Sequence, residues 1–464
     1  MSFGKELQNT INSEHISVSG LFKKTGIQRS LLYAVMRGDR RLTPENCGKL
    51  INSSCFPNAA VPGLFNSYLR LELTTEELEA WDVFIAGLRG EIAAELTKRR
   101  ERSFPVRELE NGRVYYGADE VTGAIGCALD KGTDAVLSDF AFEGEIPALV
   151  LEAYRSGRIK NVGHVVRFDG LSPAKKLRSL FMAVPFAEAG IDTKLYDLGG
   201  AAYDSFILTD DHFIEYMDDL SQAVVHPADS APRSLADRIG AAENITFRFR
   251  DIADSVMRNE YISGKIGNIE WFGFTTSFPL VFASKDNVLE SLDPVLRGTA
   301  DALTMANGLE QHFKVTTAGI TNWHSLMTDS AVDDFFKNGT LLEASKALFP
   351  GGASENTRIS MAKPFLNTPG FTLTLIQSKF FGELKQYVTA NNSDLQFFGI
   401  TGGTMDTPYA FTNIRVILND PKLSQLCKKL TEYFTNSYFC MSDDVAKLFI
   451  SQRISVLKGM IAHK

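Results

Sequence analysis

The segment from Ser17 to Pro44 constrains the fold most strongly, because capping residues, glycines and apolar residues follow one another at spacings that few backbones admit. Ser17 is a favoured N-cap residue, and Gly26 stands where a helix must end in a sharp turn that needs a positive φ. Gly38 suits the C′ position of the next helix, and Thr43 followed by Pro44 is typical of the start of a third. The segment therefore predicts three short helices separated by tight turns.

The apolar residues of this segment indicate how the first two helices pack. Leu21 and Phe22 are predicted to face inward from the first helix, and Ile27 is predicted to fill the gap between the two helices. Leu32 and Val35 follow Ile27 by five and eight positions, which places them on the inner face of a second helix that begins near position 28. Two helices joined by a short turn that contains glycine form the order of a helix-turn-helix.

The charge of the chain is divided unevenly. Residues 1–70 contain nine Lys or Arg and four Asp or Glu, a net charge of +5, although the whole chain of 464 residues carries −8. The remaining residues therefore carry −13. Such an asymmetry predicts a small module that binds a polyanion, attached to an acidic body that discourages unspecific wrapping by the same polyanion.

Residues 4–55 resemble the lambda-repressor/Cro type of DNA-binding domain. In that family a glycine and an apolar residue precede the recognition helix, as Gly26-Ile27 do here, and a glycine with basic residues follows it, as in Gly38-Asp39-Arg40-Arg41. Phe22 stands where the family has a small alanine, and Thr25 stands where it has an apolar residue. The resemblance therefore implies a helix pair that packs slightly wider than in the family.

The resemblance also implies that residues 28–37 enter the major groove of double-stranded DNA, which admits an α-helix. The side chains predicted to face the bases are Gln28, Arg29, Ser30, Tyr33 and Arg37. Gln pairs with adenine and Arg with guanine through two hydrogen bonds each. The side chains predicted to contact phosphates are Lys23, Lys24, Arg40 and Arg41. The alternative is a helical bundle whose basic face is merely solvated.

The rest of the chain predicts a larger mixed α/β body. Acidic residues after Thr75 and basic residues near residue 100 favour a single connecting helix of about 25 residues. Further on, predicted helices (117–131, 145–157, 172–188, 243–259, 290–312, 328–347, 421–435, 442–460) alternate with predicted strands (135–137, 162–168, 194–196, 205–209, 213–216, 269–283, 371–377, 395–400, 413–418). The predicted fold class is multi-domain α + α/β: a helix-turn-helix domain (1–72), the connecting helix (73–104), an α/β domain (105–230) and a second α/β sensor or oligomerisation domain (231–464).

Part of the body resembles phospholipase-D-like sensor domains of some regulators. Residues 206–214, Phe-Ile-Leu-Thr-Asp-Asp-His-Phe-Ile, are similar to a β-hairpin of those domains. The enzymes of that family use a His-x-Lys-x4-Asp motif in which the histidine is the nucleophile. The nearest match, His164-Val-Val-Arg-Phe-Asp169, lacks both the lysine and the spacing. We therefore expect this copy of the domain to be catalytically silent.

Other chemistry-bearing motifs are missing from the sequence. The seven histidines and five cysteines show no H-x3-H, HExxH or C-x2-C spacing, so we expect no metal site. Phosphate-binding glycine motifs and a G-x-S-x-G elbow are also missing, so we expect no cofactor, no catalytic residue and no enzymatic activity. A polar start and the lack of about 20 consecutive apolar residues favour a cytoplasmic protein without a membrane partner.

The sequence thus predicts a DNA-binding transcriptional regulator. We expect a homodimer that reads a two-fold operator, and a body that senses a small-molecule, peptide or protein effector. Two alternatives remain: an enzyme or effector that carries the helix-turn-helix as an accessory module, and a module that serves as a protein–protein adaptor.

Overall fold

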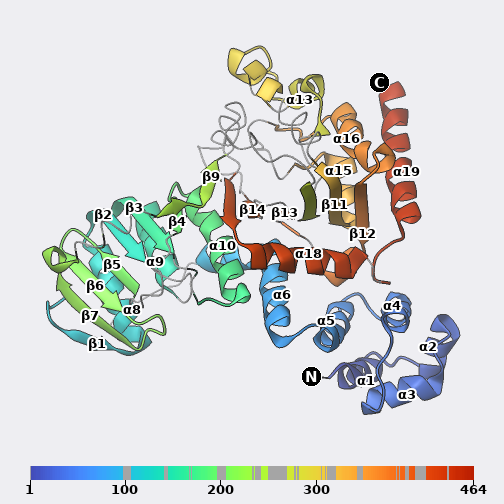
Figure 1. Ribbon diagram of the computed structural model, residues 1–464, viewed down its shortest axis with the longest axis horizontal. Helices are drawn as coiled ribbons and strands as arrows, with labels where there is room; N and C mark the ends of the chain where they lie inside the picture. The colour runs from blue at the N-terminus through green and yellow to red at the C-terminus, as the bar shows by residue number, and fades with distance from the viewer. Residues whose placement is uncertain are drawn as a thin grey trace. The chain divides into compact units, whose positions relative to one another are not determined.

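The computed structural model describes the chain apart from residues 1, 98–105, 140–144, 167, 169, 196–204, 233–234, 236–241, 249–268, 276–277, 279–281, 305, 309, 311–319, 342–348, 383, 386, 392–396, 403–413, 436–437 and 464. The chain divides into two compact units (Figure 1). Unit 1 comprises Met1–Arg89, Arg250–Gly399 and Asn419–Lys464, and unit 2 comprises Gly90–Phe249 and Ile400–Leu418. Each is a mixture of helices and strands, as the predicted fold class requires.

Unit 1 begins with six helices. They are α1 (Phe3–Ser13), α2 (Val18–Thr25), α3 (Arg29–Arg37), α4 (Pro44–Asn52), α5 (Val61–Glu72) and α6 (Thr75–Leu88). The start of α6 is defined by a capping box, in which the Thr74 side chain accepts from the backbone of Glu77 and the Glu77 side chain accepts from the backbone of Thr74. The helices at residues 18–25 and 29–37, with the turn between them, follow the predicted helix-turn-helix order.

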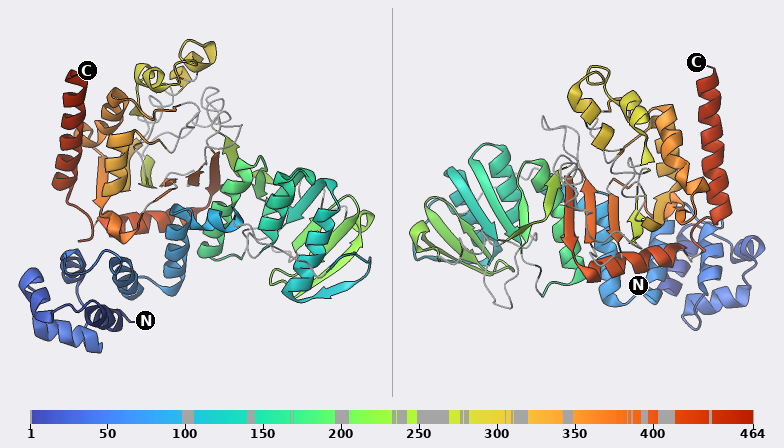
Figure 2. Two further views of the ribbon diagram at one scale, coloured as in Figure 1. Left: turned by 180° about the vertical axis from the view of Figure 1, so that it is seen from behind. Right: turned by 45° about the horizontal axis from the view of Figure 1, so that its top comes forward.

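The remainder of unit 1 is built on a sheet with the strand order β12-β11-β10-β13-β14. β10, β11 and β12 run parallel, and β13 is antiparallel to β10. The elements are β10 (Ile269–Phe274), α13 (Lys285–Ser291), β11 (Ile320–Thr328), α15 (Asp329–Asn338), α16 (Glu355–Ala362), α17 (Pro364–Asn367), β12 (Phe371–Ile376), η3 (Ser378–Phe380), β13 (Tyr387–Asn391), β14 (Phe397–Gly402), α18 (Pro421–Thr435) and α19 (Asp443–Ala462). Helix α18 runs past β10, β11 and β13, whereas α19 lies beside β12, α15 and α16 (Figure 2).

Unit 2 contains an eight-stranded sheet in the order β1-β7-β6-β5-β2-β3-β4-β8. β2, β3 and β4 run parallel, and β5 is antiparallel to β2. The elements are α7 (Glu91–Thr97), β1 (Val114–Tyr116), α8 (Gly117–Asp130), β2 (Thr133–Asp139), α9 (Ile146–Arg155), β3 (Ile159–Val166), α10 (Pro173–Glu188), β4 (Thr193–Leu195), β5 (Ser205–Leu208), β6 (His212–Tyr216), β7 (Gln222–Pro227), η1 (Ala228–Ser230), β8 (Glu243–Asn244), β9 (Thr246–Arg248) and β15 (Ile414–Asn419).

The two sheets share one strand order, which the sequence analysis did not foresee. In unit 2 the order β4-β3-β2-β5-β6 corresponds, strand for strand along the chain, to β12-β11-β10-β13-β14 of unit 1. In both, three parallel strands linked through helices are followed by a strand that returns antiparallel beside the first of them. His164 lies on β3 and His324 on β11, the middle parallel strand of each sheet.

Four predicted helices differ from the structure. The connecting helix is broken: α6 ends at Leu88, and Gly90 adopts φ 72°, which a right-handed helix cannot continue through. The helix predicted at 328–347 ends at Asn338 because Gly339 adopts φ 68°. Residues 243–248 form strands β8 and β9 rather than a helix, and residues 292–299 interrupt the helix predicted at 290–312.

The division into units also differs from the predicted linear order of domains. The helix-turn-helix module belongs to the same unit as the C-terminal half, and unit 2 contains the α/β region predicted at 105–230. The first and last parts of the chain pack together because their apolar faces cover one another, as described below. The basic cluster predicted at residues 98–102 lies outside the described residues.

Candidate nucleic-acid interface

The turn between α2 and α3 is built by short-range interactions. The Ser17 hydroxyl accepts a hydrogen bond from the Gly20 amide at 3.3 Å, which satisfies one free donor at the start of α2. Gly26 ends α2 with φ 73°, a left-handed conformation that costs glycine little. Ile27 is 3% exposed and lies between the helices, as predicted. At the other end of α3, Gly38 adopts φ 84°.

Helix α3 is held by its inner face. Leu32 and Val35 are buried, as is Leu21 of α2. A Cβ atom added at Gly4 of α1 would lie 2.0 Å from the carbonyl oxygen of Val35, so α1 rests directly on the backbone of α3. The predicted inward residues of α3 therefore form the core, and the orientation of the helix is set from two sides.

Phe22 does not face inward, and this prediction was wrong. Its side chain is 39% exposed, and the guanidinium of Arg29 lies 5.6 Å from the ring centroid, within cation–π range. Leu21 takes the buried position, and the next residue on a helix points about 100° away from it. The Phe22 ring therefore makes a surface contact with Arg29 and does not insert between the two helices.

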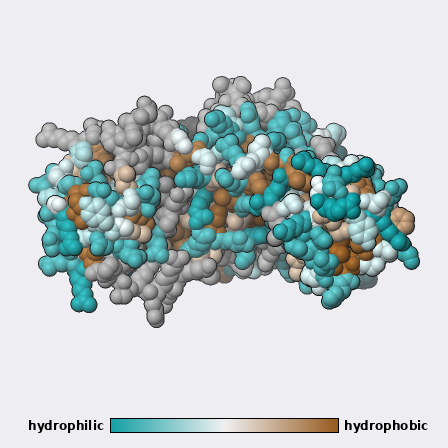
Figure 3. Space-filling view, turned by 90° about the horizontal axis from the view of Figure 1, so that it is seen from below, coloured by the Kyte–Doolittle hydropathy of each residue, from teal (hydrophilic) through white to brown (hydrophobic). Residues whose placement is uncertain are grey.

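The side chains predicted to bind DNA are all exposed on the module. They are Lys23, Lys24, Gln28, Arg29, Ser30, Tyr33, Arg37, Arg40 and Arg41. The Tyr33 side chain is 49% exposed, so its ring is not part of the core of the module. In the view from below, hydrophilic residues dominate much of the lobe that the module forms (Figure 3). None of the outward side chains of α3 is buried against the rest of the chain.

Two of these cations already have partners within the module. Nε of Arg37 lies 2.8 Å from Oδ2 of Asp39, with both side chains more than half exposed. Nζ of Lys24 donates to the Ser54 hydroxyl at 3.2 Å. An exposed ion pair is worth about 0–1 kcal/mol, so a phosphate or base would displace Asp39 at little cost. The sequence analysis did not predict that Asp39 would pair with Arg37.

The opposite end of the module is attached to the C-terminal half of unit 1. A Cβ atom added at Gly48 of α4 would lie 2.5 Å from Cβ of Tyr438, so glycine is required for this close approach. The Asn52 side-chain amide donates to the Tyr438 carbonyl oxygen at 3.1 Å. These contacts join segments 386 residues apart in the sequence.

An aromatic cluster completes the attachment. The fully buried ring of Phe65, on α5, lies 5.0 Å from Phe380, 5.9 Å from Phe381, 5.8 Å from Phe434 and 4.9 Å from Phe439, centroid to centroid. Aromatic pairs at such distances add about 0.5–1.5 kcal/mol each beyond the area that they bury. The module is therefore packed against the C-terminal half of unit 1 and is not merely tethered to it.

The structure also reveals a polar cluster in the body that the sequence analysis missed. Lys428 of α18 lies 3.1 Å from Glu270 of β10 and 3.9 Å from Glu432, and the Asn322 amide donates to Glu270 at 3.4 Å. His324 stacks on the ring of Phe272 at 5.2 Å, and burial lowers its pKa. The residues lie on three separate segments between Glu270 and Glu432, so no local motif signals them. The ion pair between Lys428 and Glu270 joins α18 to the sheet.

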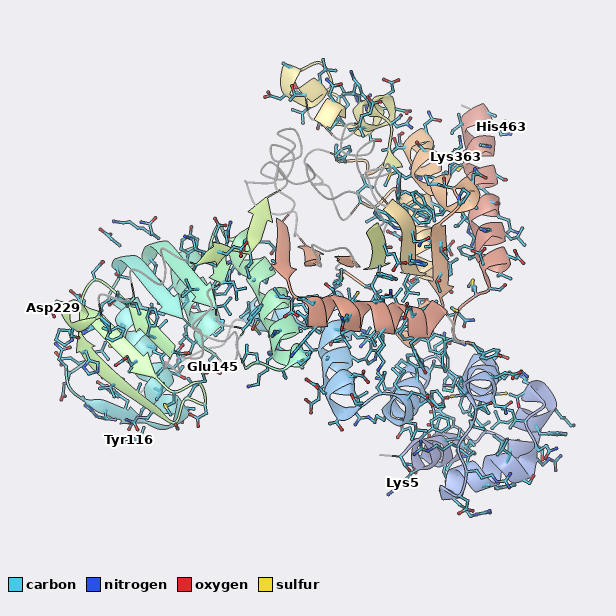
Figure 4. All side chains as sticks on the ribbon, in the orientation of Figure 1. Lys5, Tyr116, Glu145, Asp229, Lys363 and His463 are labelled. Carbon is cyan, nitrogen blue, oxygen red and sulfur yellow. The ribbon has the colours of Figure 1, made fainter. Side chains whose placement is uncertain are left out.

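A pocket of about 350 Å³ lies within unit 1, on the side of α13 and α17. Its lining includes Ser284, Glu310, Ser360, Lys363 and Asn367, with Phe282 as its aromatic wall. Lys363 is labelled in Figure 4. The volume is at the lower end of the range for small-molecule sites, and a cation and a carboxylate among hydroxyl and amide groups suit a small polar ligand. No sequence signal pointed to these residues.

Over the part of the chain that the structure describes, no three His, Cys, Asp or Glu side chains are grouped to hold a metal ion. The same part contains no helix with the length and apolarity needed to cross a bilayer.

No protein-family model and no curated protein matches the chain. Among solved structures, the chain is similar to TrmBL2, described as an archaeal chromatin protein with a novel mode of DNA binding (14% identity, TM-score 0.24, 47% of this chain and 84% of that chain). It is also similar to polyphosphate kinase from Porphyromonas gingivalis (11% identity, TM-score 0.22, 69% of this chain and 50% of that one). A third similarity is to phosphatidylserine synthase from Haemophilus influenzae Rd KW20 (9% identity, TM-score 0.23, 81% and 97%). Similarities at this level do not establish a family, so the two resemblances found in the sequence stay predictions.

Proposed function

We propose that the chain is a sequence-specific DNA-binding transcriptional regulator without enzymatic activity, acting in the cytoplasm. The observation that carries the proposal is the division of α3: Leu32 and Val35 are buried, whereas Arg29, Tyr33 and Arg37 are exposed beside the basic residues of the neighbouring turns. A helix that is anchored on one face and polar on the other, in a module whose first 70 residues carry a net charge of +5, suits insertion into the major groove.

We further propose that the protein binds a two-fold operator as a homodimer and that its body senses an effector. The pocket lined by Lys363 and Glu310 supports a small polar effector. The aromatic cluster around Phe65 supports coupling, because a change in the position of α18 or of residues 438–440 would be transmitted to the module through packed rings. Coupling requires that the effector bind one arrangement more tightly than the other.

Selection of random duplex DNA by the full chain at low salt tests the proposal. We expect an enriched sequence whose affinity falls by about 5- to 150-fold in Arg29→Ala, which corresponds to about 1–3 kcal/mol for a lost bidentate base contact. Arg70→Ala is the matched control, since Arg70 is an exposed cation on α5 that pairs with Asp82 at 3.9 Å and is not predicted to contact DNA. Failure to enrich any sequence, or equal loss in both variants, would refute DNA readout by α3 and favour the protein-adaptor alternative.

A further inference from the structure

Helix α19 carries an unusual concentration of exposed apolar side chains. Among the described residues, eleven large hydrophobic side chains are exposed, and four of them lie on this single helix: Val445 (50%), Leu448 (58%), Val456 (63%) and Met460 (49%). The helix also has a conventional buried face, so it is apolar on two sides. Exposed apolar residues that gather in this way mark an interaction site, whereas single ones need no explanation.

Three of the four exposed apolar residues form one continuous stripe together with Gln452 and Gly459. Val445, Leu448, Gln452, Val456 and Gly459 follow one another at spacings of three or four residues, which is the pattern of a helix that packs against another helix. The buried residues Ala446, Ile450, Ile454 and Leu457 occupy a different face and are used within unit 1. The stripe therefore has no partner within the described part of its own chain.

We propose that this stripe, defined as residues 445, 448, 452, 456 and 459, pairs with the same stripe of a second copy of the chain, the two α19 helices running antiparallel. A two-fold axis beside Gln452 would place Leu448 opposite Val456 of the second copy and Val445 opposite its Gly459 and Met460. Each contact then occurs twice, as an isologous interface requires. The small Gly459 would leave room for Val445.

The charged residues towards the two ends of α19 favour this direction. Asp443 and Asp444 lie in its first turn, and Lys458 and His463 lie near its C-terminal end, where His463 is labelled in Figure 4. An antiparallel pair brings acidic and basic ends together and aligns the helix dipoles favourably, whereas a parallel pair would oppose like ends. Lys447 already pairs with Asp443 at 2.6 Å, so Asp444 is the acidic residue of this turn that would face the basic end of the second copy.

The inference deepens the proposed function, since it names the surface that would join two regulators on a two-fold operator, but its test requires no DNA. The mass of the full chain is measured by sedimentation between about 1 and 50 µM. We expect a dimer whose dissociation constant rises at least 100-fold in the double variant Leu448→Glu, Val456→Glu. Val295→Glu is the matched control, because Val295 is an 84% exposed valine elsewhere in unit 1. Circular dichroism verifies that each variant is folded.

Oxidative cross-linking tests the direction of the pair. Gln452→Cys should form a covalent dimer because the two copies of position 452 meet at the axis, whereas Asp443→Cys should not, because its two copies lie at opposite ends. A wild-type chain that is monomeric at 50 µM, or a double variant that stays dimeric, overturns the proposal. Equal cross-linking of both cysteine variants overturns the antiparallel arrangement. A wild-type chain that forms the dimer but binds no DNA would refute the proposed function and leave the proposed pairing of α19 intact.

Discussion

The attachment of the N-terminal module to the C-terminal half can be measured as a coupling energy. Phe65 of α5 and Phe439 lie 4.9 Å apart in an edge-to-face arrangement, and both are buried. Replacing either by alanine should lower the free energy of unfolding by about 3–5 kcal/mol, the usual cost of removing a buried phenylalanine. Because the rings contact each other, the double variant should be less unstable than the sum of the two, by about 0.5–1.5 kcal/mol.

Urea denaturation of the four proteins, followed by circular dichroism, supplies the double-mutant cycle. The control cycle combines Phe65→Ala with Phe278→Ala, since Phe278 contacts Phe335, Phe336 and Phe365 in a different ring cluster. That pair should be additive to within about 0.3–0.5 kcal/mol. If the Phe65–Phe439 cycle is also additive, or if Phe65→Ala unfolds the module while the C-terminal half keeps its full stability, the packed attachment is refuted.

Three further predictions follow from single residues. Gly38→Ala should lower the free energy of unfolding by about 1–2 kcal/mol in chemical denaturation, because φ is 84° there while the added methyl group meets no atom within 4 Å; Gly20→Ala, in the interior of α2, should be neutral or stabilising, and equal destabilisation of both would contradict the argument. Burial lowers the pKa of His324, so the unfolded chain takes up its proton first and stability should fall as the pH drops through about 6.5 towards the lower folded pKa. His324→Gln should flatten this part of the pH–stability curve, and an unchanged curve would exclude the residue as its source. Lys23→Ala should weaken binding to all duplexes alike and reduce the slope of log affinity against log salt by about 1, and a changed base preference would contradict a phosphate contact.

The local architecture of the module could be predicted from short-range patterns. Ser17, Gly26, Gly38 and Thr43 act through their own caps and φ angles, which depend on neighbours within four residues. The side chains expected on the outer face of α3 are exposed for the same reason, since helical periodicity separates them from Leu32 and Val35. Their role in binding DNA stays a prediction that only an experiment with DNA tests.

Errors arose where a helix was continued through a glycine. Gly90 and Gly339 each adopt a positive φ and end a helix that hydrophobic periodicity had extended. A glycine is tolerated inside helices as well as at their ends, so the residue type alone does not choose between the two. Phe22 illustrates a related case, because Leu21 and Phe22 are both apolar and only packing decided which one is buried.

The sequence by itself therefore determined the helix-turn-helix order, the basic character of the module and the alternation of strands and helices, because these depend on residues that are close in the chain. Tertiary structure alone decided that α4 and α5 pack on residues near 380 and 438, that Glu270, His324 and Lys428 meet, and that two sheets share one strand order. The hydrophobic effect is not directional, so an apolar ring does not specify which ring it will pack against. Charged residues 158 positions apart, such as Glu270 and Lys428, produce no periodic pattern in the sequence. Such pairings arise only when the folded chain brings their surfaces together.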